Sequence, residues 1–543
     1  MGPDRATGDM TNSLPARRGV NWRVVAPLFV LILLLGVRLE ILLSGQRFLR
    51  SDEAVVGLMA KHIFTRGERP VFLYGQPYGG GHAIVAYLAA PIFALVGPSA
   101  LVLTGVTVAF SVANVVLVWI ILRHAFDDVV ALAGASLYAF TPPVIYLAFL
   151  VNGGTESFFF ALIALWFFLQ AYRDNRAPQH NAALTGLFCG LAVYAMDYAL
   201  LYPLVFGALW LFTGRRDKYR CVGLLVLGFL VGCAPMILYD LTHDFAHLRH
   251  MAGGSPGGGP GIIQRVAGAW GGILTGDLAA FYSGEIDNFK WSAVGPWAWL
   301  HAGVVMTALI GLVVRQRSAI IRAFKRISLK GEEDAPVPPA LIVALFLIAY
   351  LMIYSVSRFS VPPFRTPRYF LPLAPFDAMA VALFFLWKRR GRWRHVGAIL
   401  VAVLVIHGAL QGMAFGMRAW HEEHGIATSG RDIRELGAWL TEHDVGIAIA
   451  PYEIQWRTMF ATNESVIISS ELLSPVDRYP AFSEEVRRRL QEGEPCALIL
   501  RRDLAWSRFA LDAVGLKQPE GPPMPLLRLT YDRRLLPPPV QVA

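Results

Sequence analysis

Charged residues are scarce in this sequence of 543 residues. Asp, Glu, Lys and Arg together make up only 16% of the chain, whereas hydrophobic residues make up 55%. The mean hydropathy is +0.48. A soluble protein of this length carries more charge. Because several apolar runs are long enough to cross a bilayer, the composition predicts a polytopic helical membrane protein.

Cysteine is also scarce, and the positions of the four cysteines exclude a disulfide framework. Cys189, Cys221 and Cys233 fall in apolar runs, and Cys496 stands alone in the polar C-terminal part. The C-terminal part, residues 417–543, contains no Walker loop or glycine fingerprint. The net charge of +10 does not indicate nucleic acid as a partner, because most of the excess lies in short loops between apolar runs, where it sets topology.

The apolar runs predict about eleven crossings. Residues 1–23 are polar and are expected to form a cytoplasmic tail. Residues 24–43 are too long for a cleavable signal peptide and lack a small-residue cleavage site, so they are expected to be a signal anchor. The further crossings are predicted at 99–122, 129–149, 156–172, 182–196, 198–213, 221–240, 292–314, 338–356, 369–387 and 395–416.

The segment 82–97 is apolar but short, and Pro91 interrupts it. If it dips into the membrane without crossing, the basic loops all fall on the side of the N-terminus, which is the positive-inside pattern. These loops contain Arg123, Arg173 with Arg176, residues 215–220, 315–330 and 388–394. We therefore expect a multi-pass protein of a bacterial-type inner membrane, with a cytoplasmic N-terminus, a transmembrane domain over 24–416, and residues 417–543 outside.

The C-terminal part, 417–543, changes character. Residues 430–443 and 453–461 are predicted to be helices, and 446–450, 465–469 and 497–500 are predicted to be strands. Alternating helices and strands indicate a small α/β domain with a parallel sheet.

A carboxylate pair, Asp52-Glu53, follows the first crossing directly and opens an outer loop over 44–98. Acids at the boundary of a membrane favour a functional site, because they are costly inside hydrocarbon. The alternative is structural: Asp52 caps a helix over 54–64, and Glu53 favours its positive end. Val55, Met59 and Ile63 would lie on one face of that helix, as in a helix lying in the interface plane.

Other polar residues fall on the same predicted side. They are the turn 152–156 with Glu156, the single acid Asp197, a long loop over 240–290 that begins with Asp240, and the basic loop 358–368. Residues 253–261 of the long loop are almost all glycine and proline, which suits a flexible lid or a plain linker.

These features resemble the GT-C glycosyltransferases, and among them the polytopic family that includes protein O-mannosyltransferases and lipid A aminoarabinose transferases. Asp52-Glu53 in the first outer loop resembles the mark of that superfamily, and Thr155-Glu156 resembles its second acidic position. Arg368-Tyr369-Phe370-Leu371-Pro372 resembles the run that opens a late crossing. The resemblance covers most of the chain and depends on the order and sidedness of the motifs.

The resemblance implies transfer of a sugar from a polyprenyl-phosphate donor to a lipid, glycan or protein acceptor on the outer face, with inversion at the sugar carbon. Inversion needs one base that deprotonates the acceptor, and Asp52 occupies the family's position for it, with Glu53 as the alternative. Arg358, Arg365 and Arg368 can bind the lipid phosphate, because guanidinium groups fit phosphate oxygens. Anchoring to lipid headgroups is the competing interpretation of these arginines.

The remaining residues have weaker assignments. His82 is expected to contact the phosphate or the acceptor, or to be a satisfied interfacial histidine. Glu156 is expected to orient the acceptor or to bind a divalent metal with Asp52, since some superfamily members use a metal and others do not. Asp197 marks a turn or joins the site. Asp240 and His243 either join it or cap the preceding crossing.

Two other classes of function compete with an enzyme. A transporter or flippase of lipid-linked sugars is also polytopic, but such proteins usually place ionisable groups near the middle of the bilayer and contain internal repeats. In this sequence the acids lie at the outer boundary, and no repeat is apparent. A non-catalytic assembly partner on the same scaffold would not need Asp52, Glu53 and Glu156.

Overall fold

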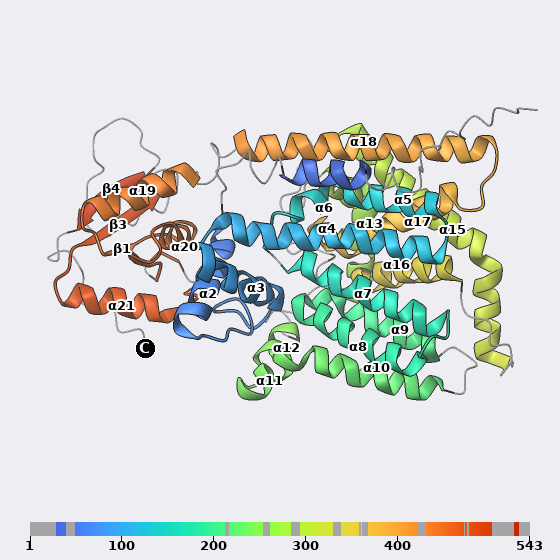
Figure 1. Ribbon diagram of the computed structural model, residues 1–543, viewed down its shortest axis with the longest axis horizontal. Coiled ribbons are helices and arrows are strands. Elements are labelled where there is room, and N and C mark those ends of the chain that lie inside the picture. The colour runs from blue at the N-terminus through green and yellow to red at the C-terminus, as the bar shows by residue number, and fades with distance from the viewer. Residues whose placement is uncertain are drawn as a thin grey trace, which may run out of the picture.

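The computed structural model describes residues 29–39, 49–151, 153–211, 217–252, 261–283, 294–329, 338–357, 360, 367–421, 430–471, 473–474, 477–501 and 526–531. They form a long helical bundle with a small α/β domain beyond one of its ends (Figure 1). We call this end of the bundle the domain end. The expected fold class, a polytopic helical membrane protein with a C-terminal α/β domain, is confirmed.

Six helical segments in the described part of the chain are long and apolar enough to cross a membrane. They lie in α4 (Ala100–Ala125), α7 (Gly154–Tyr172), α15 (Pro296–Leu329), α16 (Pro339–Val356), η4 with α17 (Pro367–Leu373 and Ala374–Leu386) and α18 (Arg392–His421). The helix Phe29–Leu39 is shorter, and the rest of the first expected crossing lies outside the described residues.

Shorter helices complete the bundle, and a bent pair can add a seventh crossing. By length and composition six or seven crossings qualify among the described residues, so the expected count of eleven is not confirmed. The shorter helices are α5 (Asp128–Ala139), α6 (Pro142–Leu147), α8 (Pro178–Ala195), η1 (Asp197–Leu200), α9 (Leu201–Leu211), α10 (Lys218–Gly232), α11 (Ala234–Thr242), α12 (Ala246–Ala252), α13 (Ile262–Thr275) and α14 (Asp277–Ser283).

Helices α8 and α10 approach each other through glycines spaced four residues apart, a spacing that lets two membrane helices touch closely. A Cβ atom on Gly186 of α8 would lie 1.9 Å from the carbonyl oxygen of Leu225, and one on Gly232 would lie 2.2 Å from that of Leu187. After Gly232 the chain bends by 62° into α11, and α11 and α12 lie at the domain end (Figure 1).

Helices α2 (Ser51–Arg66) and α3 (Gly80–Val96) pack together at the domain end, between the bundle and the C-terminal domain (Figure 1). Residues 54–60 of α2 are all buried, and a Cβ atom on Gly57 would lie 2.4 Å from the ring of Phe460. The expectation of one apolar face is therefore wrong, because α3 and the C-terminal domain pack against this helix, whereas its orientation relative to the membrane stays a prediction.

The C-terminal domain has a four-stranded sheet in the order β2-β1-β3-β4. Strands β1 (Ile447–Ile449), β2 (Ile467–Ser469) and β3 (Cys496–Arg501) are parallel, as expected, whereas β4 (Leu526–Tyr531) is antiparallel to β3 and was not expected. The helices are α19 (Gly430–Glu442), α20 (Tyr452–Ala461) and α21 (Pro480–Gln491). Side chains of α2, α3, α19 and α20 share one hydrophobic cluster, which joins this domain to the bundle.

Candidate active site

Asp52 lies in the first turn of α2, with 48% of its side chain exposed. Its Oδ1 accepts a hydrogen bond of 2.5 Å from the hydroxyl of Tyr452 and one of 3.1 Å from Nη2 of Arg478. Both partners belong to the C-terminal domain. One carboxylate oxygen of Asp52 is thus held in place while the side chain remains accessible, an arrangement that suits a general base.

Glu53 differs from Asp52 in being buried. Its Oε2 accepts the backbone N–H of Arg50 at 2.8 Å, which is how the third residue of a helix caps its own first turn. Because α2 begins at Ser51, Asp52 is inside the helix and is not its N-cap, so the capping alternative for Asp52 is wrong and capping falls to Glu53. Burial raises the pKa of Glu53 to about 7, although backbone hydrogen bonds from Arg50 and Val151 oppose it.

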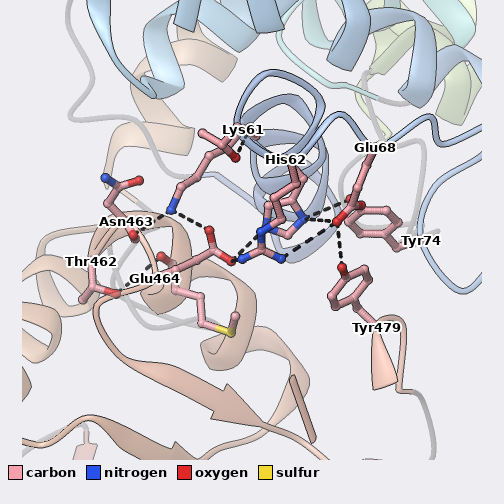
Figure 2. A network of polar contacts seen from close by, with 11 residues as sticks. Lys61, His62, Glu68, Tyr74, Thr462, Asn463, Glu464 and Tyr479 are labelled. Carbon is pink, nitrogen blue, oxygen red and sulfur yellow. Dashed lines mark hydrogen bonds and ion pairs between the residues drawn. The ribbon is translucent and has the colours of Figure 1, made fainter. Parts of the chain in front are cut away.

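A polar network joins the other end of α2 to the C-terminal domain (Figure 2). Glu464 accepts a hydrogen bond of 2.8 Å from Nε2 of His62. It also forms ion pairs with Lys61 at 2.5 Å and with Arg66 at 3.1 Å. The hydroxyl of Tyr479 donates to Glu68 at 2.8 Å. We call these residues the clamp.

Burial alone would raise the pKa of Glu464, but the hydrogen bonds and charges of His62 and Lys61 outweigh it and lower that pKa to about 2. The carboxylate of Glu464 is therefore ionised throughout the physiological range of pH.

His82 is buried at the start of α3, where its Nδ1 lies 3.0 Å from the carbonyl oxygen of Gly79. Burial lowers the pKa of His82, which favours the neutral ring. This local contact is what we expect of an interfacial histidine whose hydrogen bond is satisfied within the protein. The backbone approaches closely here, because a Cβ atom on Gly81 would lie 2.3 Å from the Cα atom of Gly153, directly before α7.

Glu156, in the first turn of α7, is completely buried. Among the described residues, neither of its carboxylate oxygens has a hydrogen-bond partner, and the hydroxyl of nearby Tyr198 is also buried without one. Such a group inside a helical bundle is costly and marks a functional position by default.

Asp197 and Asp240 are brought together by a histidine that sequence reasoning did not select. Nε2 of His247 lies 3.0 Å from Asp197, the backbone N–H of His247 donates to Asp240 at 2.8 Å, and its Nδ1 lies 3.6 Å from the other oxygen of Asp240. His243, which was the candidate, is exposed and contacts the carbonyl oxygen of Tyr239. His243 is the C-cap residue of α11, which agrees with the capping alternative, and a part for it in the site stays a prediction.

The candidate phosphate-binding arginines cannot be placed. Arg358 and Arg365 lie outside the described residues, and of Arg368 only the backbone, in η4, is described. Their assignment stays a prediction.

The described residues contain no group of three His, Cys, Asp or Glu side chains able to hold a metal ion.

The principal residues that sequence reasoning missed are Arg478, Tyr452 and Gln76. The amide oxygen of Gln76, in the orientation that satisfies its neighbours, accepts from the Arg478 guanidinium at 2.6 and 2.8 Å. No motif marks Arg478, and it lies 426 residues from Asp52 in the sequence. Only the docking of the C-terminal domain onto α2 brings the two together.

Comparisons with known proteins agree with this architecture. Residues 82–239 match the family described as dolichyl-phosphate-mannose-protein mannosyltransferase. The structure is similar to that of ArnT from Cupriavidus metallidurans in the apo state, with a TM-score of 0.57 and 14% identity over 90% of this chain and 94% of that one. For ArnT bound to undecaprenyl phosphate the TM-score is 0.58, with 13% identity over 92% and 96%.

A third similar structure is the apo form of the Archaeoglobus fulgidus oligosaccharyltransferase, with a TM-score of 0.53 and 14% identity over 92% of this chain and 72% of that one. No curated protein matches the sequence. The expected resemblance is confirmed: this chain has the fold of the GT-C membrane glycosyltransferases. Identities this low establish the fold and leave the reaction to the site.

Proposed function

We propose that this protein is an inverting glycosyltransferase that moves a sugar from a polyprenyl-phosphate donor to an acceptor on the outer face of the membrane. The observation that carries the proposal is Asp52, an accessible carboxylate held through one oxygen at the domain end of a GT-C fold. ArnT, which shares this fold, has been crystallised with undecaprenyl phosphate, and this supports a lipid-phosphate carrier for the present chain.

In the proposed reaction a hydroxyl of the acceptor gives its proton to Asp52 and attacks the anomeric carbon of the sugar. The bond between that carbon and the phosphate oxygen breaks, and the lipid phosphate leaves with the electron pair. A single displacement of this kind inverts the anomeric configuration and needs one base opposite the leaving group. Arg358, Arg365 and Arg368 are the residues we expect to neutralise the leaving phosphate.

Sidedness is part of the proposal. The positive-inside pattern of the basic loops supports a cytoplasmic N-terminus and an external C-terminal domain. Because Asp52 contacts that domain through Tyr452 and Arg478, the acceptor would be modified outside as well. A periplasmic reporter fused after Ala543 should be active, whereas activity of a cytoplasmic reporter at that position would contradict the outward orientation.

The experiment that tests the function uses the purified protein in liposomes. Undecaprenyl-phosphate mannose, glucose and arabinose are supplied separately, and undecaprenyl phosphate release is followed by mass spectrometry. We expect release from one of these donors, with the sugar recovered on water or on added lipid and glycan acceptors. A lipid-linked sugar that only moves between leaflets, with its sugar–phosphate bond intact, would instead support the transporter class.

A further inference from the structure

Two sets of contacts, one at each end of α2, join the C-terminal domain to this helix. At the N-terminal end Tyr452 and Arg478 reach Asp52. At the C-terminal end Glu464 contacts Lys61 and His62 within the clamp (Figure 2). Between them lies the apolar contact of α2 with α20. The domain is therefore fixed against the whole length of the helix that carries Asp52.

Arg478 is itself held in a defined position. Its side chain is 9% exposed, its guanidinium lies 5.3 Å from the centre of the Tyr452 ring, and its Nε donates to the Tyr452 hydroxyl. On its other side it is bound by the Gln76 amide. A buried arginine with this number of partners is preorganised, so it fixes the atom that it contacts.

The two contacts converge on one oxygen of Asp52. Both Tyr452 and Arg478 donate to Oδ1, whereas none of the described residues donates to Oδ2. Restraint through Oδ1 fixes the direction in which Oδ2 points. Placement within about 0.5 Å matters for proton transfer, and misplacement by about 1 Å can cost roughly 100-fold in rate.

We propose that the C-terminal domain completes the active site, with Tyr452 and Arg478 acting as positioning residues that hold Asp52 through Oδ1 so that Oδ2 receives the proton of the acceptor. This inference rests on the proposed role of Asp52 as the base. It assigns to the C-terminal domain a direct part in the reaction, and it makes the clamp, through Glu464, the device that keeps those two residues in reach.

The test compares Arg478→Gln and Tyr452→Phe with the wild type in the liposome assay, using the undecaprenyl-phosphate sugar that the protein consumes. Both variants should lose about 10- to 100-fold in kcat with KM for the donor nearly unchanged, because donor binding does not use them. Arg478→Lys should recover part of the loss. Arg487→Gln is the matched control, since Arg487 is an exposed arginine of the same domain that pairs with Glu471.

A double variant separates positioning from a general structural role. If Arg478 acts through Asp52, adding Arg478→Gln to Asp52→Asn should cost no further activity. This inference alone would be overturned if the losses of the two single variants multiplied in the double variant. It would also be overturned if Arg478→Gln and Tyr452→Phe both kept the wild-type kcat while Asp52→Asn was inactive. Wild-type activity of Asp52→Asn would overturn the assignment of the base and this inference together.

Discussion

Nε2 of His247 lies 3.0 Å from Oδ1 of Asp197, and this contact ties α12 to the 3-10 turn η1. Asp240 faces the same imidazole from the end of α11. The ring of Phe72 stacks on the His247 imidazole, with ring centroids 5.8 Å apart. Burial lowers the pKa of His247, but the hydrogen bond and charge of Asp197 and the charge of Asp240 outweigh it, so the pKa is raised above the usual 6.5.

The stability that His247 contributes should therefore depend on pH. A raised pKa means that the contribution is complete below about pH 6.5 and is lost as the pH rises through the higher pKa of the folded state. Hydrogen exchange of residues 246–252, corrected for intrinsic rates, should show less protection at pH 9 than at pH 6. Asp197→Asn should remove most of this dependence. Equal protection at both values in the wild type would contradict the prediction.

The stability that Glu53 contributes should change with pH in the same direction as that of His247. Because its pKa is raised to about 7, wild-type stability should fall as the pH rises from about 4.5, where an unfolded Glu ionises, through about 7. Glu53→Gln cannot ionise and should lack this part of the fall. Glu53→Ala, which also loses the cap, should be about 1 kcal/mol less stable. Thermal unfolding across this pH range would measure the difference, and parallel curves for wild type and Glu53→Gln would refute it.

Glu464 is predicted to govern docking of the C-terminal domain. Its lowered pKa implies that the clamp is intact above about pH 4.5 and is lost as the pH falls toward about 2. Glu464→Gln should weaken it at neutral pH and increase hydrogen exchange in residues 57–66. Glu471→Gln, which removes an exposed pair with Arg487, is the control and should leave that exchange unchanged. Equal exchange in the two variants would argue against the clamp.

Gly81 should tolerate no side chain, because its Cβ atom would meet backbone atoms of Gly153 at 2.3 Å. We expect Gly81→Ala to destabilise the protein by about 1–3 kcal/mol, the usual cost of overpacking. Gly105→Ala is the matched control, since Gly105 is also helical and has nothing within 4 Å of the corresponding Cβ position. It should be neutral or stabilising by up to about 1 kcal/mol. Similar unfolding temperatures for the two variants would contradict the close approach.

Patterns within a few residues of each other allowed most of the fold to be predicted. The apolar runs at 99–122, 156–172 and 338–356 correspond to α4, α7 and α16, and the short β-branched runs of the tail to β1 and β2. These signals depend on local periodicity, which the sequence displays directly. Strand β4 was missed although Leu527, Leu529 and Tyr531 alternate with polar residues.

The site could be predicted only in part, because its partners come from distant parts of the chain. Asp52 is marked by its place after an apolar run, whereas Arg478 has no mark and is positioned by docking of a whole domain. His247 was not selected from the sequence, and the reason is local. Asp244 and Phe245 have positive φ values of 52° and 56°, which end α11 and turn His247 back toward Asp240.

If Asp52 is the base, the variant Asp52→Asn should be folded but nearly inactive. The substitution keeps the shape and hydrogen-bonding capacity of the side chain but removes its basicity, and because Asp52 is not the N-cap, α2 should be preserved. We expect this variant to bind undecaprenyl phosphate normally and to lose about 10²–10⁴-fold in the rate of undecaprenyl phosphate release from its sugar donor. A folded variant that turns over at the wild-type rate would show that Asp52 is not the base.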